Sequence, residues 1–279
     1  MIELGKYQTL EVIKKADFGL YLAAPGEDKN NTVLLPKKEV PEGTVPGDQL
    51  KVFIYKDSED RIIATTAQVP VTIGKLALLK VKEVNNIGAF LDWGLLKDLL
   101  LPFKEQTAKI EEGNSVLVTL YVDKSKRLCA TMKVYDLLST GSCYKKNDMV
   151  TGTVYEEIEA FGMFVAVDNQ YSAMLPKNEL FSSVKIGDTV HARVIDVRPD
   201  GKLTLSLREK SFLQMDQDAE MIFKKITAAG GFMPFHDNSS PEAIKEEFKL
   251  SKNAFKRAIG KLYKTGAIEI TGDGIRIIS

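Results

Sequence analysis

The amino-acid sequence predicts a multidomain protein in which three tandem five-stranded β-barrels are followed by a small α+β domain. Its 279 residues lie at the upper limit for one compact domain, so several smaller domains are expected. Three landmarks recur in the same order three times before about residue 206. Beyond residue 208 the spacing of apolar residues changes from strand to helix periodicity. These observations place the barrels first and the α+β domain last.

The three landmarks define the repeat. The first is a glycine flanked by apolar or aromatic residues, the second is Leu-Pro, and the third is a glycine followed by Asp or Asn. The proline precedes the last glycine by 11 residues in every copy, and the first glycine precedes the proline by 17, 14 and 14 residues. Such constant spacing indicates one structural unit used three times. The landmarks are Gly19, Pro36 and Gly47, then Gly88, Pro102 and Gly113, then Gly162, Pro176 and Gly187.

Each repeat of about 70 residues is expected to form five strands. Five strands in so short a unit bury a core and avoid exposed edges by closing into an OB-type barrel. The first-landmark glycine fits a tight bend of such a barrel, where a Cβ would obstruct the curling of the sheet. After the third landmark, the predicted strand pairs lie at 50–54 and 62–64, 116–120 and 128–130, and 190–194 and 203–205.

The C-terminal segment is predicted to hold three helices and a hairpin. The first helix has its apolar stripe at i, i+4, i+7 and i+11 and ends at two glycines. Ser240 and Pro241 are a typical N-cap and first residue for the second helix. A third helix follows Leu250-Ser251 and ends at Gly266, and strands at 268–270 and 275–277 flank a Gly-Asp-Gly turn. The apolar stripes are Met215, Ala219, Ile222 and Ile226; Ile244 and Phe248; and Phe255, Ile259 and Leu262.

Four domains follow from this pattern, at residues 1–68, 69–138, 139–212 and 213–279. The linkers around 67–74 and 136–147 are short, which favours a semi-rigid string of barrels.

The chain resembles a known family. Val150-x-Gly152-x-Val154, Phe161-Gly162-Met163-Phe164, Gly187-Asp188-x-Val190 and Leu203-x-Leu205-Ser206 are similar to an S1-type RNA-binding domain, and the first two repeats are degenerate copies. Three helices and a hairpin resemble a winged helix-turn-helix. The whole arrangement is similar to the conserved virulence factor B family of bacterial RNA-binding proteins. The resemblance implies a non-catalytic post-transcriptional regulator whose partner is single-stranded RNA.

The resemblance also implies which barrel residues contact RNA. Aromatic side chains near the first landmark would stack on bases, and a basic residue entering the last strand would contact the backbone. Prolines replace the histidine usual in S1 domains, and the lysines after them are expected to contact phosphates instead. The alternative for each aromatic residue is packing in the barrel core, and Trp93 is either a surface platform or a core or interdomain contact. The candidate residues are Phe18, Tyr21, Phe90, Phe161 and Phe164; Arg61, Arg127 and Lys202; and Lys37, Lys38, Lys104 and Lys177.

The densest basic run of the chain falls in the predicted recognition helix of the winged helix. Between residues 249 and 268 there are six basic residues and no acidic one. Such a face would contact phosphates in a salt-sensitive manner, without reading sequence. The alternative is a solvated helix face that favours solubility. The six residues are Lys249, Lys252, Lys256, Arg257, Lys261 and Lys264.

Composition excludes several classes of protein. The formal net charge is zero, with 38 basic and 38 acidic residues, so no global positive field indicates nucleic acid. No apolar run reaches the roughly 20 residues that span a membrane, and the N-terminus does not resemble a secretory signal, so a cytoplasmic location is expected. Neither histidine nor either cysteine lies in a metal or catalytic motif. We therefore expect no enzymatic activity, no cofactor and no small-molecule substrate.

Two other hypotheses remain. The barrels and winged helix can serve as an adaptor that docks onto an RNA-handling assembly, which predicts weak nucleic-acid binding and a specific protein partner. Alternatively, the winged helix can regulate DNA, which predicts a preference for duplex that disappears when Lys252, Lys256 and Arg257 are replaced.

Overall fold

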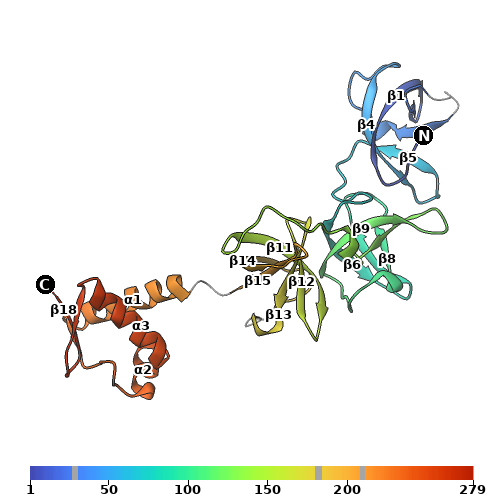
Figure 1. Ribbon diagram of the computed structural model, residues 1–279. Helices are drawn as coiled ribbons and strands as arrows, with labels where there is room; N and C mark the ends of the chain where they lie inside the picture. The colour runs from blue at the N-terminus through green and yellow to red at the C-terminus, as the bar shows by residue number, and fades with distance from the viewer. Residues whose placement is uncertain (27–30, 180–183, 208–210, 279) are drawn as a thin grey trace. The chain divides into compact units, whose positions relative to one another are not determined.

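A computed structural model describes residues 1–279 except 27–30, 180–183, 208–210 and 279, and except the side chains of residues 211–216. The chain divides into two units, residues 1–207 and 208–279 (Figure 1). The first unit contains the three predicted barrels and the second contains the predicted winged helix. Domain boundaries at 68 and 138 within the first unit remain a proposal.

The first barrel is closed, in the strand order β1-β2-β3-β5-β4. Four of the five strand contacts are antiparallel, and the parallel pair β3–β5, with Leu34 opposite Ile63, closes the ring. Apolar residues at alternate positions fill the interior, as the period-two pattern predicts. The strands are β1 (Tyr7–Ala16), β2 (Gly19–Ala23), β3 (Thr32–Pro36), β4 (Gln49–Lys56) and β5 (Ile62–Thr65).

The third barrel repeats this topology. Its order is β11-β12-β13-β15-β14, and the parallel pair β13–β15, with Ala173 opposite Leu203, closes it. The predicted repeat is therefore confirmed in three dimensions. The strands are β11 (Met149–Ile158), β12 (Gly162–Val167), β13 (Tyr171–Pro176), β14 (Thr189–Val197) and β15 (Leu203–Ser206).

The second barrel has the same five strands, but the described residues show no ladder between β8 and β10. The sheet runs β10-β9-β6-β7-β8, so β8 and β10 are its edge strands. The segments that follow these two strands are joined by a hydrogen bond, in which the Met132 N–H donates to the Glu105 carbonyl (2.9 Å). The strands are β6 (Ala77–Val84), β7 (Gly88–Asp92), β8 (Leu99–Pro102), β9 (Ser115–Val122) and β10 (Leu128–Thr131).

The first-landmark glycine is explained by the close approach of two strands. Gly19, Gly88 and Gly162 all have positive φ. A Cβ at each would collide with the backbone carbonyl of a leucine in the next strand, namely Leu35, Leu101 and Leu175. The Cβ predicted to obstruct the curling of the sheet would therefore clash with the neighbouring strand, so only glycine fits at this position.

A fourth landmark, which was not predicted, is a glutamate three residues after each Leu-Pro proline. It lies in a short 3-10 turn: η1 (Lys37–Glu39), η2 (Phe103–Glu105) and η4 (Lys177–Glu179). Each carboxylate accepts a hydrogen bond from a buried hydroxyl that ends the last strand, contributed by Thr65, Thr131 and Ser206. This clasp ties the strand ends that close each barrel.

Neighbouring barrels share apolar contacts. Trp93 of the second barrel is 3% exposed and meets Phe53 and Tyr55 of the first edge-on, with ring centres 6.0 and 6.2 Å apart. Between the second and third barrels, Leu117 and Tyr155 belong to one buried cluster. Of the roles left open for Trp93, the structure supports interdomain packing.

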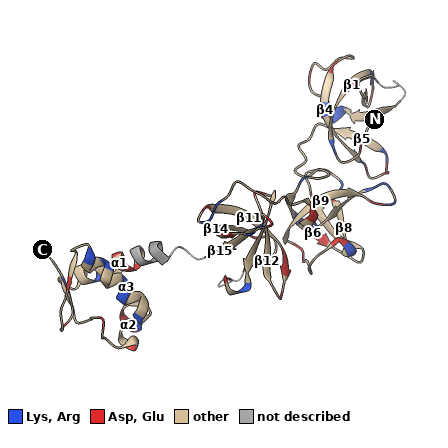
Figure 2. Cartoon of the chain, in the orientation of Figure 1, with Lys and Arg blue, Asp and Glu red and all other residues tan. Residues whose placement is uncertain are grey.

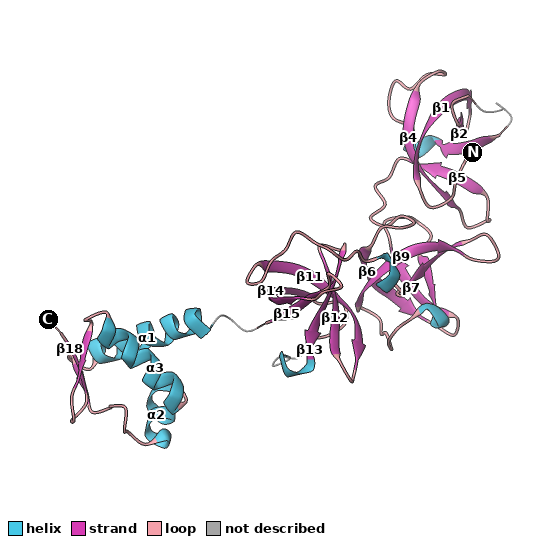
Figure 3. Cartoon of the chain, viewed as in Figure 1, coloured by secondary structure: helices cyan, strands magenta, loops and turns pink. Residues whose placement is uncertain are grey.

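The second unit is a winged helix, as predicted (Figure 3). Ser240 caps α2 and Ser251 caps α3, each accepting a hydrogen bond from the N–H three residues on (3.2 Å). The expected core residues from Ala219 to Leu262 are buried, whereas the Met215 side chain lies outside the described residues. One strand, β16, was not predicted. The elements are α1 (Ser211–Ala228), β16 (Phe232–Met233), α2 (Pro241–Phe248), α3 (Lys252–Lys264), β17 (Ile268–Ile270) and β18 (Ile275–Ile277).

Among the described helices, none has the length and apolar character needed to cross a membrane.

Candidate nucleic-acid interface

Two aromatic rings and a lysine come together on the outside of the first barrel. Phe18, in the turn between β1 and β2, is 57% exposed, and its ring lies 6.0 Å from that of Tyr21 at 81°. A shift of register in β1 between Val12 and Lys14 places Lys14 directly opposite Tyr21. The Lys14 ammonium lies 4.6 Å from the centre of the Tyr21 ring, a cation–π distance. These side chains present two ring surfaces beside a positive charge.

Two further lysines border this cluster. Lys37 and Lys38 are exposed in η1, and the Lys37 N–H donates to the Phe18 carbonyl (2.9 Å), which brings η1 next to the aromatic turn. Within the described part of the chain neither lysine forms an ion pair. We call the set Lys14, Phe18, Tyr21, Lys37 and Lys38 the first-barrel face.

Arg61, the third basic candidate of this barrel, is already neutralised. Its guanidinium lies 2.7 Å from the Asp57 carboxylate and 3.0 Å from that of Glu59. The pKa of Arg61 is raised, mainly because its guanidinium donates a hydrogen bond to Asp57. A phosphate would have to compete with two carboxylates at this position.

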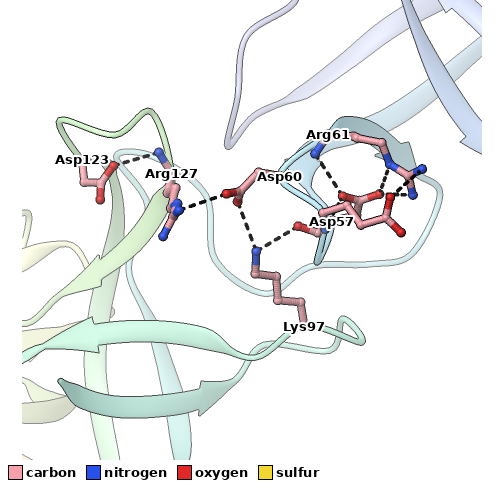
Figure 4. A network of polar contacts seen from close by, with 7 residues as sticks. Asp57, Asp60, Arg61, Lys97, Asp123 and Arg127 are labelled. Atoms are coloured by element: carbon pink, nitrogen blue, oxygen red, sulfur yellow. Dashed lines mark hydrogen bonds and ion pairs between the residues drawn. The ribbon is translucent and has the colours of Figure 1, made fainter. Parts of the chain in front are cut away.

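The matching surface of the second barrel is partly covered by the first (Figure 4). Phe90 is half-buried and lines a pocket of about 210 Å³ together with Trp93 and Arg127. Asp60, from the β4–β5 turn of the first barrel, pairs with Arg127 (3.0 Å) and with Lys97 (3.6 Å). A carboxylate of this chain thus occupies the place where Arg127 would meet a phosphate.

Lys104, the remaining candidate of the second barrel, is exposed. It forms no ion pair with any described residue. The residue opposite Phe90 across the strand pair is Glu83, where the first barrel has Lys14 opposite Tyr21.

The third barrel exposes one of its two candidate aromatic residues. Phe161 is 59% exposed. Phe164 is half-buried between Tyr135 (ring centres 6.4 Å apart) and Tyr155 (6.3 Å), so it packs at the junction of the barrels. Glu156 lies directly opposite Phe164.

The two basic candidates of the third barrel differ in their partners, because Lys202 meets a carboxylate and Lys177 meets a backbone carbonyl. Lys202 pairs with Asp200 (3.1 Å), and the Lys177 ammonium lies 3.4 Å from the Glu159 carbonyl. Among the described surfaces, the first barrel brings two candidate aromatic residues together with lysines that form no ion pair, whereas on the third barrel only Phe161 of the two candidate rings is exposed, beside Lys177.

The basic residues of the winged helix lie on the outer side of α3. Lys256, Arg257 and Lys264 are exposed, Lys252 and Lys261 are half-exposed, and the opposite side buries Phe255, Ile259 and Leu262. Lys and Arg positions are marked in blue along α3 in Figure 2. Lys249 ends α2 in a left-handed conformation. Lys256 forms a weak ion pair with Asp237 (3.9 Å).

No group of three or more His, Cys, Asp or Glu side chains with metal-site geometry occurs among the described residues. His191 contacts the Thr151 hydroxyl (2.9 Å), and the His236 ring accepts from the Asn238 N–H (3.1 Å). Burial raises the pKa of the Cys129 thiol to about 11, which keeps it protonated.

Comparison with protein families divides the chain as the fold does. The S1 domain matches residues 4–67 and 73–133, the second domain of the virulence regulatory factor CvfB matches residues 136–209, and the CvfB-like winged helix domain matches residues 220–277. The S1 domain thus matches the first two repeats, whose S1 motifs are degenerate in sequence. The third repeat instead matches the family model for the second domain of CvfB.

Relatives share almost the full length. An uncharacterized protein of Bacillus subtilis strain 168, YitL, is 33% identical over 95% of this chain and 90% of its own. Conserved virulence factor B of Staphylococcus aureus strain N315 is 31% identical over 82% of this chain and 81% of its own. A crystal structure of a multidomain protein with nucleic acid binding domains from Streptococcus pneumoniae TIGR4 is 28% identical, with a TM-score of 0.54 over 99% of this chain and 98% of that one. The chain belongs to the conserved virulence factor B family.

Proposed function

We propose that this protein is a non-catalytic, cytoplasmic regulator of gene expression that binds single-stranded RNA, with the first-barrel face as its main contact surface. The observation that carries the proposal is the pairing of Phe18 and Tyr21 with three lysines that have no carboxylate partner in the described chain. The S1 domains in the first half of the chain, and the nucleic acid binding domains named for the pneumococcal protein, support the same class of ligand.

The chemistry of the face suits an unpaired strand. Bases of a single strand can splay and stack on Phe18 and Tyr21, whereas the bases of a duplex are already stacked on each other. Each base stacked on an aromatic side chain contributes about 1–3 kcal/mol. Lys14, Lys37 and Lys38 lie beside the rings, where the phosphates of such a strand would pass.

The winged helix is proposed to add affinity without sequence preference. Its exposed cations, Lys256, Arg257 and Lys264, follow one side of α3. Contacts to phosphates from such a row release counterions, so they weaken as salt rises.

The proposal is tested by fluorescence anisotropy on the full chain. Single-stranded RNA, single-stranded DNA and duplex DNA of the same base composition are titrated at two salt concentrations. We expect salt-sensitive binding that is tightest for single-stranded RNA. Absence of binding to all three would contradict the proposal and favour an adaptor that docks onto other RNA-handling proteins.

A second candidate function rests on α3, whose basic side has the position of a DNA recognition helix. Replacing Lys252, Lys256 and Arg257 by alanine separates the two candidates. RNA binding through the barrels predicts a modest loss of affinity for all three ligands. Regulation of DNA predicts a preference for duplex that disappears in this variant and persists when Phe18 and Tyr21 are replaced.

A further inference from the structure

Exposed apolar side chains mark the outer face of the second barrel. Ile87 precedes the first-landmark glycine, in the place of Phe18 of the first barrel, and is 53% exposed. Phe103 follows the Leu-Pro proline, in the place of Lys37, and is 51% exposed. The glycine and the proline pair with each other across β7 and β8, so Ile87 and Phe103 lie next to each other at the strand ends. An apolar patch therefore replaces the ring and the lysine of the first-barrel face.

The charges around this patch do not suit a phosphate backbone. Glu83, opposite Phe90, is exposed and forms no ion pair with any described residue. Arg127 is paired with Asp60 (3.0 Å; Figure 4). Lys104 is then the only basic candidate of this barrel that has no ion pair in the described chain. One free lysine beside an unpaired carboxylate leaves no net positive charge, on which contacts with phosphates depend.

A pocket opens beside the patch. Ile87, Phe90 and Leu100 line it, together with Trp93, and its volume is about 210 Å³. Since a cavity of about 150 Å³ already holds a benzene ring, there is room for one aliphatic or aromatic side chain. Trp93 also packs against the first barrel, so the pocket is continuous with the interface between the two barrels. Contiguous exposed apolar surface beside such a pocket is typical of a site that binds protein.

We propose that this surface, the second-barrel face, is a docking site for a protein partner. The partner is a chain segment that inserts one aliphatic or aromatic side chain into the pocket and places a lysine or arginine against Glu83. A side chain anchored in a pocket supplies much of the affinity in such contacts, and a charge at the rim fixes the orientation. The chain then binds RNA and a protein through different barrels, so this site does not depend on the proposed function. The second-barrel face consists of Glu83, Ile87, Phe90, Leu100 and Phe103.

The test selects phage-displayed random short peptides on the full chain. We expect the dominant peptides to share an aliphatic or aromatic residue and a nearby lysine or arginine. Synthetic copies are then titrated by fluorescence anisotropy. Replacing Ile87 and Phe103 by glutamate should weaken their binding at least tenfold, and Glu83→Lys at least threefold. The matched control on the first barrel, Phe18→Ala with Tyr21→Ala, should change it less than twofold.

Two results would overturn the docking site: no enrichment of any peptide, or dominant peptides that bind the Ile87→Glu, Phe103→Glu variant as tightly as wild type. If that variant loses its cooperative thermal unfolding transition, serine at both positions repeats the test.

Single-stranded RNA distinguishes this site from a nucleic-acid surface. The Ile87→Glu, Phe103→Glu variant should bind RNA within threefold of wild type. A loss of RNA affinity of tenfold or more would show that nucleic acid occupies the second-barrel face, and would overturn the docking site while RNA binding by the chain stands. A wild-type chain that binds the peptides as expected but binds no RNA contradicts the proposed function alone.

Discussion

The first and third barrels have the same strand order and the same closing strand pair, yet their outer faces carry opposite charge beside the key aromatic ring. Lys14 lies opposite Tyr21 in the first barrel, and Glu156 lies opposite Phe164 in the third. Side chains directly opposite each other on antiparallel strands are neighbours on one face. The repeat therefore preserves the barrel, while the charge opposite the aromatic ring differs between the two copies.

A bulge in the first strand creates this position in both barrels. The register shifts between Val12 and Lys14 in β1, and between Val154 and Glu156 in β11. A bulge re-aims the side chain that follows it. The residue just after the bulge is therefore the one that faces the aromatic ring, and its charge distinguishes the barrels.

The largest expected effect comes from removing the two aromatic side chains of the first barrel. Replacing Phe18 and Tyr21 by alanine removes two stacking surfaces, which at about 1 kcal/mol or more each lowers the affinity for single-stranded RNA by roughly 30-fold or more. The matched control is Phe161→Ala, an equally exposed ring of the third barrel, for which we expect less than a threefold change. Anisotropy titration measures both. A larger effect of the control would reverse the comparison of the two barrels.

The clasp that both barrels share should matter for stability. Replacing Glu39 by alanine leaves the buried Thr65 hydroxyl without its acceptor, which lowers the free energy of unfolding by about 1–3 kcal/mol. Replacing Glu179, which accepts from Ser206, is expected to have an effect of the same size. Thermal unfolding with Glu42→Ala, an exposed glutamate nearby, as control measures the difference. Unchanged melting temperatures would show that the clasp does not stabilise the barrels.

Exchanging the charges opposite the aromatic rings tests the comparison directly. Lys14→Glu gives the first barrel the charge of the third, and should weaken RNA binding about fivefold, since exposed charge contacts contribute on the order of 1 kcal/mol. Lys14→Gln should fall between the two. Glu156→Lys should strengthen binding slightly, because Tyr135 still covers Phe164. Titration at low salt reveals these changes, and equal affinities for Lys14→Glu and wild type would remove Lys14 from the binding face.

The smallest expected effect concerns the lysines of η1. The affinity for single-stranded RNA falls with salt, and replacing Lys37 and Lys38 by alanine should make that fall less steep. The slope of log affinity against log salt should shrink by about 0.7 for each phosphate that is no longer neutralised. Arg61→Ala is the matched control, because Arg61 is already neutralised by Asp57 and Glu59 and should leave the slope unchanged. An unchanged or steeper slope in the lysine variant would be inconsistent with their proposed role.

Much of the fold was predictable because its signals are local. The spacing of Gly19, Pro36 and Gly47 and their repeats defined the barrels, and Ser240 and Gly266 marked helix ends. The candidate surface was predictable only in part. Nothing in the local sequence around Arg127 indicates that Asp60 of another barrel neutralises it, or that Tyr135 covers Phe164. These contacts depend on how the barrels pack together. The charges of Lys14 and Glu156 are visible in the sequence. The strand register is needed to show that each lies directly opposite an aromatic ring.

Photo-crosslinking identifies the residues that contact RNA directly. The full chain is irradiated in complex with single-stranded RNA that carries 4-thiouridine at several positions, and the crosslinked residues are mapped by mass spectrometry. If the first-barrel face is the main contact surface, crosslinks fall at Phe18 or Tyr21 and in the adjoining η1, with few in residues 161–164. Crosslinks confined to the third barrel would contradict this expectation.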